Sequence, residues 1–480
     1  MVTAHQELQT LTKKEIRYVS IKFSEILERG LRLEASYYDE EGKRVRNIIS
    51  HCKFEKLPMN GTIGFANVYK CGRFKRIFIE HGIPIYTASQ ILDSCPKPTK
   101  FISDKTITDL KSLILKENQI LMTRSGIIGS VVLVSKSLSG KLFSDDLLRI
   151  ECHKKEDVGF LYAFLKSSIG HTLITTNNYG SVITHIEPEH LEVINVPNIP
   201  QEIKNNISKK ILSSFSLRDG ANELFDEANE LLLSSLELSE VKSLKPKYFS
   251  ESDLKNYEVK YSKINLRFDA SYHIPIINNI MCELKKSGAE LVNLSDSRIT
   301  KKIILPGRFK RIYVEENYGT PFLGGGEILE FNPSKLKFLS IKGHGSRIEK
   351  ELIIRKNMIL ITCSGTIGKT VLAPEHFDGW SCSQHIIKII PSGVTNVGYL
   401  YAFLASDYGY ELIKRYSYGS VVSEIDDKHI SYIPIPIISP KVMDKIGNLI
   451  LEANEKRSEA FKLEKEAIKM CEECILSNQK

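Results

Sequence analysis

The hexapeptide GRFKRI occurs twice in this chain, at residues 72–77 and again at residues 307–312, which lie 235 positions apart. Four further segments of the first half recur in the same order in the second half, at separations of 235 or 239 positions: RLEASYY at 32–38 and RFDASYH at 267–273, ILMTRSGIIGSVVL at 120–133 and ILITCSGTIGKTVL at 359–372, FLYAFL at 160–165 and YLYAFL at 399–404, and YGSVITHI at 179–186 and YGSVVSEI at 418–425. Five collinear matches indicate a tandem duplication of a unit of ~235 residues, far longer than the units of solenoid repeats. The sequence therefore predicts two related domains, each followed by a similar tail.

Each copy begins with patterns of short strands and continues with patterns of short helices. The stretches 120–135 and 359–373 alternate polar and apolar residues on both sides of a Ser-Gly pair, as two strands joined by a tight connection would. The stretches 158–174 and 397–413 carry apolar residues at helical spacing, and an extended, proline-punctuated segment follows each of them. This order predicts mixed α+β domains.

After Pro200 and again after Pro440, the pattern becomes that of a long helix with one apolar stripe. A stripe sustained over roughly four heptads favours a helical partner, so we expect the two helices to pair and to space the domains. The alternative is that each helix packs only on its own domain. The two stripes include Ile203, Ile207, Ile211, Phe215, Leu224, Ile446, Ile450, Leu463 and Met470.

The composition is that of a globular protein, with 42% hydrophobic and 26% charged residues among 480. A formal net charge of +8 favours an acidic partner such as nucleic acid or an anionic membrane surface, although many ordinary enzymes are equally basic. No apolar run approaches the ~20 residues needed to span a bilayer, and the first residues lack an apolar signal core. We therefore expect a cytoplasmic protein.

In these repeated segments the chain resembles the specificity subunits of Type I restriction-modification systems, over almost its whole length. Each half carries a segment like ILMTRSGIIG or ILITCSGTIG, then a YGSV-like segment, then a proline-rich stretch leading into a long helix. The proline-rich stretches lack the consecutive prolines and the Glu-Gln pair common in the family, and GRFKRI replaces its usual Gly-Thr-Pro-Ser opening. The resemblance implies two target-recognition domains, at 1–200 and 246–438, separated by long helices at 201–245 and 439–480 that form an antiparallel coiled coil.

The resemblance also implies a non-catalytic subunit that binds a bipartite target in double-stranded DNA. Its partners would be adenine-N6 DNA methyltransferase subunits, with or without a restriction and translocase subunit, docked on the apolar stripes of the helices. S-adenosylmethionine and ATP would belong to those partners, so this chain is expected to hold no cofactor and no metal. The alternative within this class is the recognition subunit of a related anti-phage defence methylation system.

DNA binding requires cations for the phosphates and planar or polar side chains for the base edges. GRFKRI supplies three cations around an aromatic residue in each copy, and these are the leading contact candidates: Arg73, Lys75, Arg76, Arg308, Lys310 and Arg311. We expect a strand here, in which alternation would put Arg73, Lys75 and Ile77 on one face and Phe74 and Arg76 on the other. Cations identical in both copies are expected to position the DNA backbone rather than to read bases. The alternative is that they are only solvated strand residues.

Base readout should use residues that differ between the copies, because the halves of a bipartite target normally differ. The segments after GRFKRI differ most between the copies, and each Ser-Gly segment contributes one further cation. These regions supply the remaining candidates, which are Tyr86, Ser89, Gln90, Arg124, Lys342, His344, Ser346, Arg347 and Lys369.

Motifs of DNA-modifying and DNA-translocating enzymes are missing from the sequence. It has no Walker loop, and no glycine-rich cofactor loop combined with an Asn/Asp-Pro-Pro-aromatic segment. Asp145 and Asp146 are the one group in the first domain that suggests a metal-dependent nuclease. Two alternatives of other classes therefore stay open: a stand-alone nuclease, and a scaffold that recognises protein through the same modules.

Overall fold

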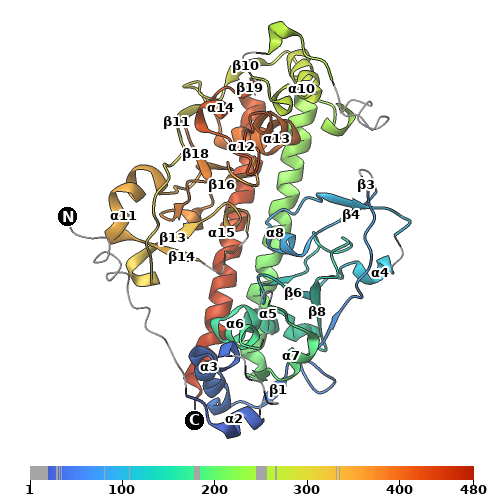
Figure 1. Cartoon of the computed structure of the whole chain (residues 1–480), viewed down its shortest axis with the longest axis vertical. Coiled ribbons are helices and arrows are strands. Elements are labelled where there is room, and N and C mark those ends of the chain that lie inside the picture. The colour runs from blue at the N-terminus through green and yellow to red at the C-terminus, as the bar shows by residue number, and fades with distance from the viewer. Residues whose placement is uncertain are drawn as a thin grey trace, which may run out of the picture.

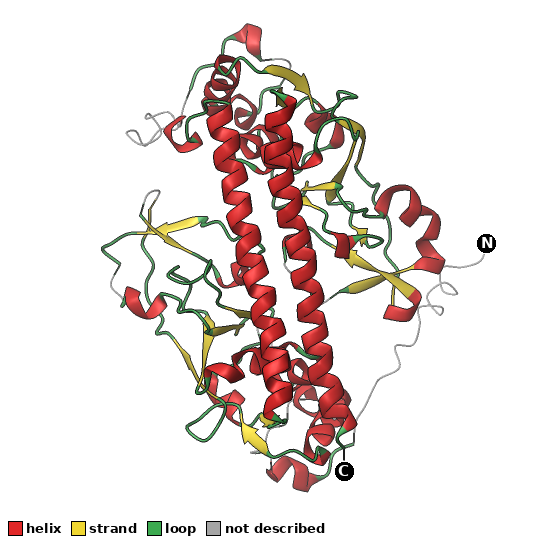
Figure 2. Ribbon diagram, turned by 180° about the vertical axis from the view of Figure 1, so that it is seen from behind, coloured by secondary structure: helices red, strands yellow, loops and turns green. Residues whose placement is uncertain are grey.

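The computed structural model describes the chain apart from residues 1–19, 29–30, 32, 34, 80–81, 107–108, 178–183, 245–256, 265–266, 331, 334–335 and 480. Two long helices, α8 (Gln201–Ser235) and α15 (Pro440–Ser477), lie side by side through the middle of the molecule, with one mixed domain on each side (Figure 1). Seen from behind, the strands of both domains lie on the flanks of this central pair (Figure 2). The predicted α+β architecture, two domains separated by long helices, is confirmed.

The central helices run in opposite directions. Lys210 of α8 lies 2.7 Å from Glu466 of α15, and further along α8 the side chain of Asn222 accepts a hydrogen bond from Arg457 at 3.3 Å. Residue numbers therefore rise along one helix as they fall along the other. Each helix has a proline at its start, where a fixed φ suits the first turn and the missing N–H has no helical partner to lose. In the part of the chain that the structure describes, no helix is both long and apolar enough to cross a membrane.

The first domain is built on two sheets. A four-stranded antiparallel sheet has the order β2 (Ala66–Lys70), β8 (Leu147–Cys152), β6 (Ile120–Thr123), β7 (Val131–Leu133), and a three-stranded sheet has the order β3 (Phe78–Ile79), β5 (Lys100–Ile102), β4 (Ile83–Ile85). The other elements are β1 (Lys56–Pro58), which pairs with β9 (Asn195–Pro197), and the helices α2 (Phe23–Glu28), α3 (Glu40–His51), α4 (Leu110–Leu113), α5 (Val158–Lys166), α6 (Ser168–Thr175) and α7 (Pro188–Glu192). Strands β6 and β7 flank the Ser-Gly pair, as the alternation predicts.

The second domain repeats this plan. One four-stranded sheet has the order β11 (Thr300–Ile304), β18 (Ile386–Pro391), β15 (Ile359–Thr362), β16 (Thr370–Leu372), and the other has the order β12 (Tyr313–Val314), β14 (Lys337–Ser340), β13 (Gly319–Leu323), β17 (Ser381–Cys382). The other elements are β10 (Glu290–Asn293), which pairs with β19 (Pro434–Ile437), and the helices α10 (Pro275–Lys286), α11 (Ile341–Arg347), α12 (Val397–Ala405), α13 (Asp407–Lys414) and α14 (Asp427–Ser431). Helices α12 and α13 correspond to α5 and α6, which are the short helices that the spacing predicts.

A glycine lets each domain approach its central helix closely. A Cβ at Gly159 of α5 would collide with the backbone of Ser208 in α8, and a Cβ at Gly398 of α12 would collide with the backbone of Gly447 in α15. Both members of each crossing lie 239 positions from their counterparts, so the duplication built the same crossing twice. The first core sits at one crossing and the second core at the other.

Each domain's core is completed by the far end of the helix that follows the other domain. Cys471 and Ile475 near the end of α15 are buried in the first core, and Leu232 near the end of α8 is buried in the second. The backbone N–H of Lys53 donates to the carbonyl of Asn478 at 2.9 Å, which joins the first domain to the C-terminal helix. Burying large apolar side chains stabilises by about 1.5–3 kcal/mol each, so this exchange of helix ends holds both halves in one body.

Candidate nucleic-acid interface

Both GRFKRI segments are extended loops, and the prediction that they form strands is wrong. The first loop leads into β3 and the second into β12. Phe74 and Phe309, the aromatic residues of the two loops, turn inward and pack against small apolar clusters. Arg73, Lys75 and Lys310 stay exposed. Each loop therefore has an inner side, which carries the aromatic residue, and an outer side, which carries exposed cations, although it is not a strand.

The second arginine of each loop is held by the domain beneath it. Arg76 forms a salt bridge with Asp145 and also donates to the hydroxyl of Ser144 at 3.2 Å. Arg311 donates instead to the side-chain carbonyl of Gln384 at 2.7 Å. Asp145 and Gln384 lie 239 positions apart, so the two loops rest on equivalent positions of different charge.

The remaining cations of the loops face solvent. Arg308 is 81% exposed and lies 3.2 Å from the carboxylate of Glu424. Arg73, Lys75 and Lys310 are exposed, and they form no salt bridge with any residue that the structure describes. Because Phe74 and Phe309 anchor the loops, these cations are held at defined positions on the surface.

An exposed aromatic residue directly follows each loop and carries a lysine over its ring. Phe78 is 51% exposed, with the ammonium of Lys100 at 5.2 Å from its ring centroid, and Tyr313 is 41% exposed, with that of Lys337 at 5.4 Å. In both domains the lysine lies diagonally across the strand pair from the ring. We did not predict these four residues, although the aromatic residue after GRFKRI in both copies is a signal that could have found them.

Three further DNA-contact candidates of the first domain differ in how far they are exposed to solvent. Tyr86 is 6% exposed and stacks on Phe143 at 4.9 Å, so it is corrected from a DNA contact to a core residue. Gln90 caps a short turn, and its amide donates to the carbonyl of Lys97 at 2.7 Å. Ser89 is exposed. Only the last keeps the surface position that base readout requires.

The candidates of the second domain lie on α11, which packs beside the second GRFKRI loop, and they are Lys342, His344, Ser346 and Arg347. The backbone N–H of Ile312 donates to Nε2 of His344 at 3.2 Å, and Arg347 donates to the carbonyl of Gly307 at 3.0 Å. These two side chains therefore support the loop. Lys342 and Ser346 are exposed beside it.

The cations of the Ser-Gly segments are not free on the surface. Arg124 is buried, with a side chain only 5% exposed, and forms ion pairs with Asp146 at 3.0 Å and with Glu187. It is corrected from a DNA contact to an interior residue. Lys369 is half-buried with its ammonium 5.5 Å from the ring of Tyr410, and burial lowers its pKa.

The acidic pair that suggested a nuclease is engaged with arginines. Asp145 pairs with Arg76, and Asp146 pairs with Arg124. Among the residues that the structure describes, no three His, Cys, Asp or Glu side chains are placed together to hold a metal ion. In this arrangement the two carboxylates neutralise arginines.

The apolar stripes of the long helices are used inside the chain. Five of their residues are at most 3% exposed, namely Ile207, Ile211, Phe215, Ile446 and Ile450, and four are half-buried, namely Ile203, Leu224, Leu463 and Met470. The five fully buried residues are corrected from docking candidates to core residues, because their surfaces already contact this chain. Leu212 of α8 is 41% exposed and lines a cavity between this helix and the first domain.

The two domains also touch each other directly, in a contact we call the clasp (Asp93, Ser94, Lys97, Leu329, Glu330 and Asp407). Asp93 and Glu330 form an antiparallel bridge, and the N–H of Ser94 donates to the carbonyl of Leu329 at 2.9 Å. Burial raises the pKa of Asp93 to about 6, although Lys369 acts in the opposite direction. Asp93 and Glu330 lie 237 positions apart, so nearly equivalent parts of the two copies meet here.

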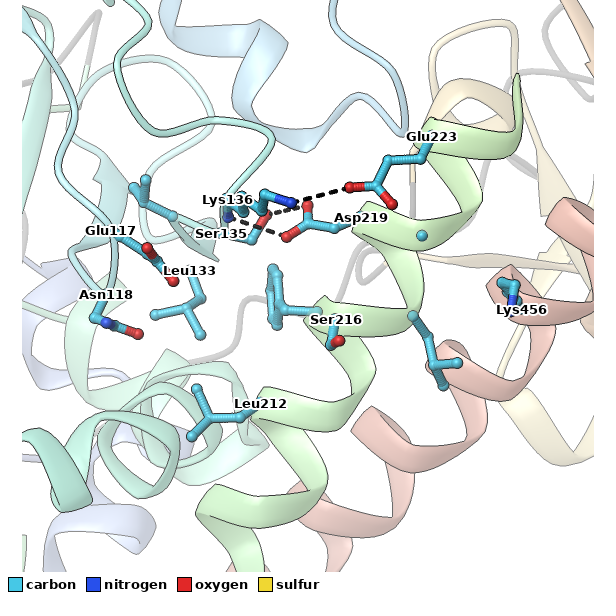
Figure 3. Close-up of a pocket in the computed structure, with 14 residues that line it drawn as sticks. Glu117, Asn118, Leu133, Ser135, Lys136, Leu212, Ser216, Asp219, Glu223 and Lys456 are labelled. Atoms are coloured by element: carbon cyan, nitrogen blue, oxygen red, sulfur yellow. Dashed lines mark hydrogen bonds and ion pairs between the residues drawn. The ribbon is translucent and has the colours of Figure 1, made fainter. Parts of the chain in front are cut away.

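A cavity of about 680 Å³ lies where the first domain meets α8 (Figure 3). Asp219 of α8 accepts hydrogen bonds from the hydroxyl of Ser135 at 2.7 Å and from the N–H of Lys136 at 3.0 Å. At the corresponding junction of the second domain with α15, the ring of His376 stacks on that of Phe461 at 4.2 Å. The second junction keeps an equivalent polar contact, because the N–H of Glu375 donates to the hydroxyl of Ser458 at 3.1 Å, and it adds these stacked rings.

Comparison with known protein families finds one match in each copy of the repeat. The family model described as "Type I restriction modification DNA specificity domain" matches residues 64–231 and residues 308–466. No curated protein matches the chain. Similar solved structures include the S subunit of a Type-I restriction-modification system from M. genitalium, which is 14% identical over 89% of this chain and 96% of that chain, with a TM-score of 0.31. An HsdS subunit from Thermoanaerobacter tengcongensis is 12% identical over 88% of this chain and 100% of that chain, with a TM-score of 0.28. A chain from a structure of the type I R-M system is 13% identical over 86% of this chain and 98% of that chain, with a TM-score of 0.27. Each of the two family-model matches falls on one copy of the repeat.

Proposed function

The chain belongs to the family of Type I restriction modification DNA specificity domains, and on that premise we propose that each of its two domains reads one half of a bipartite target in double-stranded DNA. The observation that carries the proposal is the duplicated surface, with an anchored cationic loop beside an exposed aromatic–lysine pair in both domains. Cations bind phosphates, and rings and polar side chains contact bases. The central helices set the distance between the two surfaces.

The division of labour follows from what the copies share. Lys75 and Lys310 occupy the same place in both domains, so we assign them to the DNA backbone, which carries no sequence information. Base readout falls to exposed positions that differ between the copies, such as Ser89 in the first domain and Lys342 and Ser346 in the second. The predicted assignment of shared cations to phosphates stays a prediction until binding is measured.

The partners in this proposal are adenine-N6 methyltransferase subunits, with or without a restriction and translocase subunit. They would carry S-adenosylmethionine and ATP, whereas this chain would hold no cofactor and perform no catalysis. Docking would use the outer faces of the long helices, since the apolar stripes are already buried.

The test begins with co-purification of the full chain with the products of neighbouring genes. The purified complex is then used to select binders from randomised DNA duplexes. We expect a methyltransferase partner and a target of two short blocks separated by unspecified positions. A methyltransferase partner without a motor subunit would indicate a defence methylation system of another kind. Absence of any sequence preference would contradict the proposal and favour a protein-binding scaffold.

A further inference from the structure

Residues 418–424 of the second domain form a tight turn that we call the valine tip. Tyr418 and Glu424 exchange two backbone hydrogen bonds, at 2.9 and 2.8 Å, and the N–H of Gly365 donates to the carbonyl of Ser423 at 3.0 Å. Gly419 has φ +101°, and a Cβ there would collide with the carbonyl of Val422. Only glycine suits that conformation without strain. The chain therefore holds the tip in one defined shape.

The valine tip presents apolar side chains to solvent. Val421 is 95% exposed, Val422 is 51% exposed and Tyr418 is 41% exposed. Single exposed apolar residues are ordinary, but here three of seven residues lie on a turn whose backbone is fixed by hydrogen bonds. Apolar side chains stabilise a fold by leaving water, and these two valines bury little surface within the chain. Folding therefore gives no reason for valine at both positions.

The valine tip adjoins the cationic loop of the same domain. Glu424 at its base lies 3.2 Å from the guanidinium of Arg308, the first cation of the second GRFKRI loop, which is itself 81% exposed. The tip and the loop thus form one surface that combines positive charge with apolar side chains. This combination fits DNA, in which phosphates attract the cations while thymine methyl groups and base steps offer apolar contacts inside the grooves.

We propose that the valine tip enters a groove of the DNA, where Val421, which the first copy shares as Val182, makes an apolar contact and Val422, which is Ile183 in the first copy, contacts bases of one half of the target. Arg308 would hold the adjacent phosphates. This inference rests on the proposed function and deepens it, because it names apolar residues as part of the readout by the second domain. Charge complementarity with the neighbouring loop favours DNA over a protein partner as the occupant of this surface.

The test replaces both valines with serine, Val421→Ser with Val422→Ser, in the full chain purified with its partners. The matched control is Val394→Ser, because Val394 is 75% exposed elsewhere in the same domain. The probes are the selected duplex, a scrambled duplex and the randomised duplex library. We expect the double variant to lose about tenfold in affinity for the selected duplex and to relax the sequence requirement at adjacent positions of one half. Binding of the scrambled duplex and the behaviour of the control should not change.

Unchanged affinity together with an unchanged target sequence would overturn the inference. Loss of the methyltransferase partner with an unchanged target sequence would also overturn it, since the tip would then be a protein-binding surface. The same experiment distinguishes failure of this inference from failure of the proposed function. A wild-type complex that selects a two-part target, which the double variant binds with unchanged affinity and sequence choice, defeats only this inference. A wild-type complex that selects nothing defeats the proposed function.

Discussion

The two GRFKRI loops share one sequence and one shape but differ in the charge beneath them. Arg76 of the first domain is neutralised by Asp145, whereas Arg311 of the second rests on the neutral side chain of Gln384. Burial and the neighbouring Arg311 also lower the pKa of His385, the counterpart of Asp146. In the second domain a carboxylate instead lies beside Arg308, because Glu424 stands where the first domain has His185. The two loops therefore differ in which arginine has a carboxylate partner.

The central helices show a similar contrast between duplicated positions. Arg218 forms a buried salt bridge with Glu464, while Arg457, 239 positions further on, lies 4.0 Å from the centroid of the Phe225 ring. The charge of Arg218 is thus neutralised by a carboxylate, whereas Arg457 makes a cation–π contact with an aromatic ring. At these two pairs of positions the duplication preserved the arginine and changed its partner, so the two halves differ in charge where their sequences still match.

The largest expected effect comes from removing the buried carboxylate. Glu464→Gln leaves Arg218 without its counter-charge in a site that is 0% exposed on the Glu464 side, and should cost about 3–5 kcal/mol of the free energy of unfolding. The matched change is Phe225→Leu, at the corresponding contact between α8 and α15. It removes the ring beside Arg457 and should cost about 1–2 kcal/mol of the free energy of unfolding. Urea unfolding of both variants measures the difference. Equal losses of unfolding free energy would show that the contacts of Arg218 and Arg457 contribute equally to stability.

This salt bridge also predicts an acid dependence. Burial raises the pKa of Glu464, but Arg218 and Lys166 outweigh it and lower the pKa from 4.5 to about 2. A lowered pKa stabilises the folded chain above pH 4.5, and this contribution disappears as the pH falls towards 2. Over this window the wild type should lose more stability than Glu464→Gln in urea titrations at each pH. Parallel losses would contradict the assignment.

The charge contrast beneath the loops is tested by Gln384→Glu, which gives the second loop the carboxylate that the first loop has. Neutralising Arg311 should weaken binding of the selected duplex about 3–10-fold and reduce the slope of log affinity against log salt by about one. The reciprocal change, Asp145→Asn, should increase that slope. Fluorescence anisotropy over a salt series measures both. Identical slopes in all three proteins would show that neither arginine faces DNA.

The shared lysines should affect binding without affecting sequence choice. Lys75→Ala and Lys310→Ala should each weaken binding by a few-fold, roughly equally for selected and scrambled duplexes, and reduce the salt slope by about one. Lys154→Ala, which changes an exposed lysine outside both loops, is the control. A changed target sequence in either loop variant would mean that these lysines read bases.

The smallest effect is expected at the clasp. The pKa of Asp93 is raised from 3.8 to about 6, so its contribution to the clasp is full below pH 3.8 and is lost as the pH rises through about 6. The amide of Ser94 should therefore be better protected from hydrogen exchange at pH 5 than at pH 8, after correction for intrinsic exchange. Asp93→Asn should remove this dependence. Equal protection of the wild type at both pH values would contradict the role of Asp93.

Much of the fold was predictable from the sequence, because repeated segments and apolar periodicity can be recognised in the amino-acid sequence itself. The constant separation of the repeats predicts two domains, and the apolar stripes predict α8 and α15. The clasp could not be predicted, because Asp93 and Glu330 meet only through the antiparallel packing of the helices between them. The exchange of helix ends between the two cores has the same cause.

The candidate surface was only partly predictable for a related reason. Exposure of Lys75 and Lys310 follows from their place around an inward aromatic residue. Sequence gives no measure of burial for an isolated side chain, so Tyr86 was assigned to the surface although it stacks in the core. Arg124 was assigned to DNA because its acidic partners lie 22 and 63 positions away along the chain.

The central claim, that each domain reads its own half of the target, is tested most directly by exchanging one domain. Residues 34–200 would be replaced by the corresponding domain of a relative with a different target, in the full chain with its partners, and the hybrid used to select duplexes from a randomised library. We expect that one block of the target changes to the relative's sequence while the other block stays the same. A change in both blocks, or in neither, would contradict it.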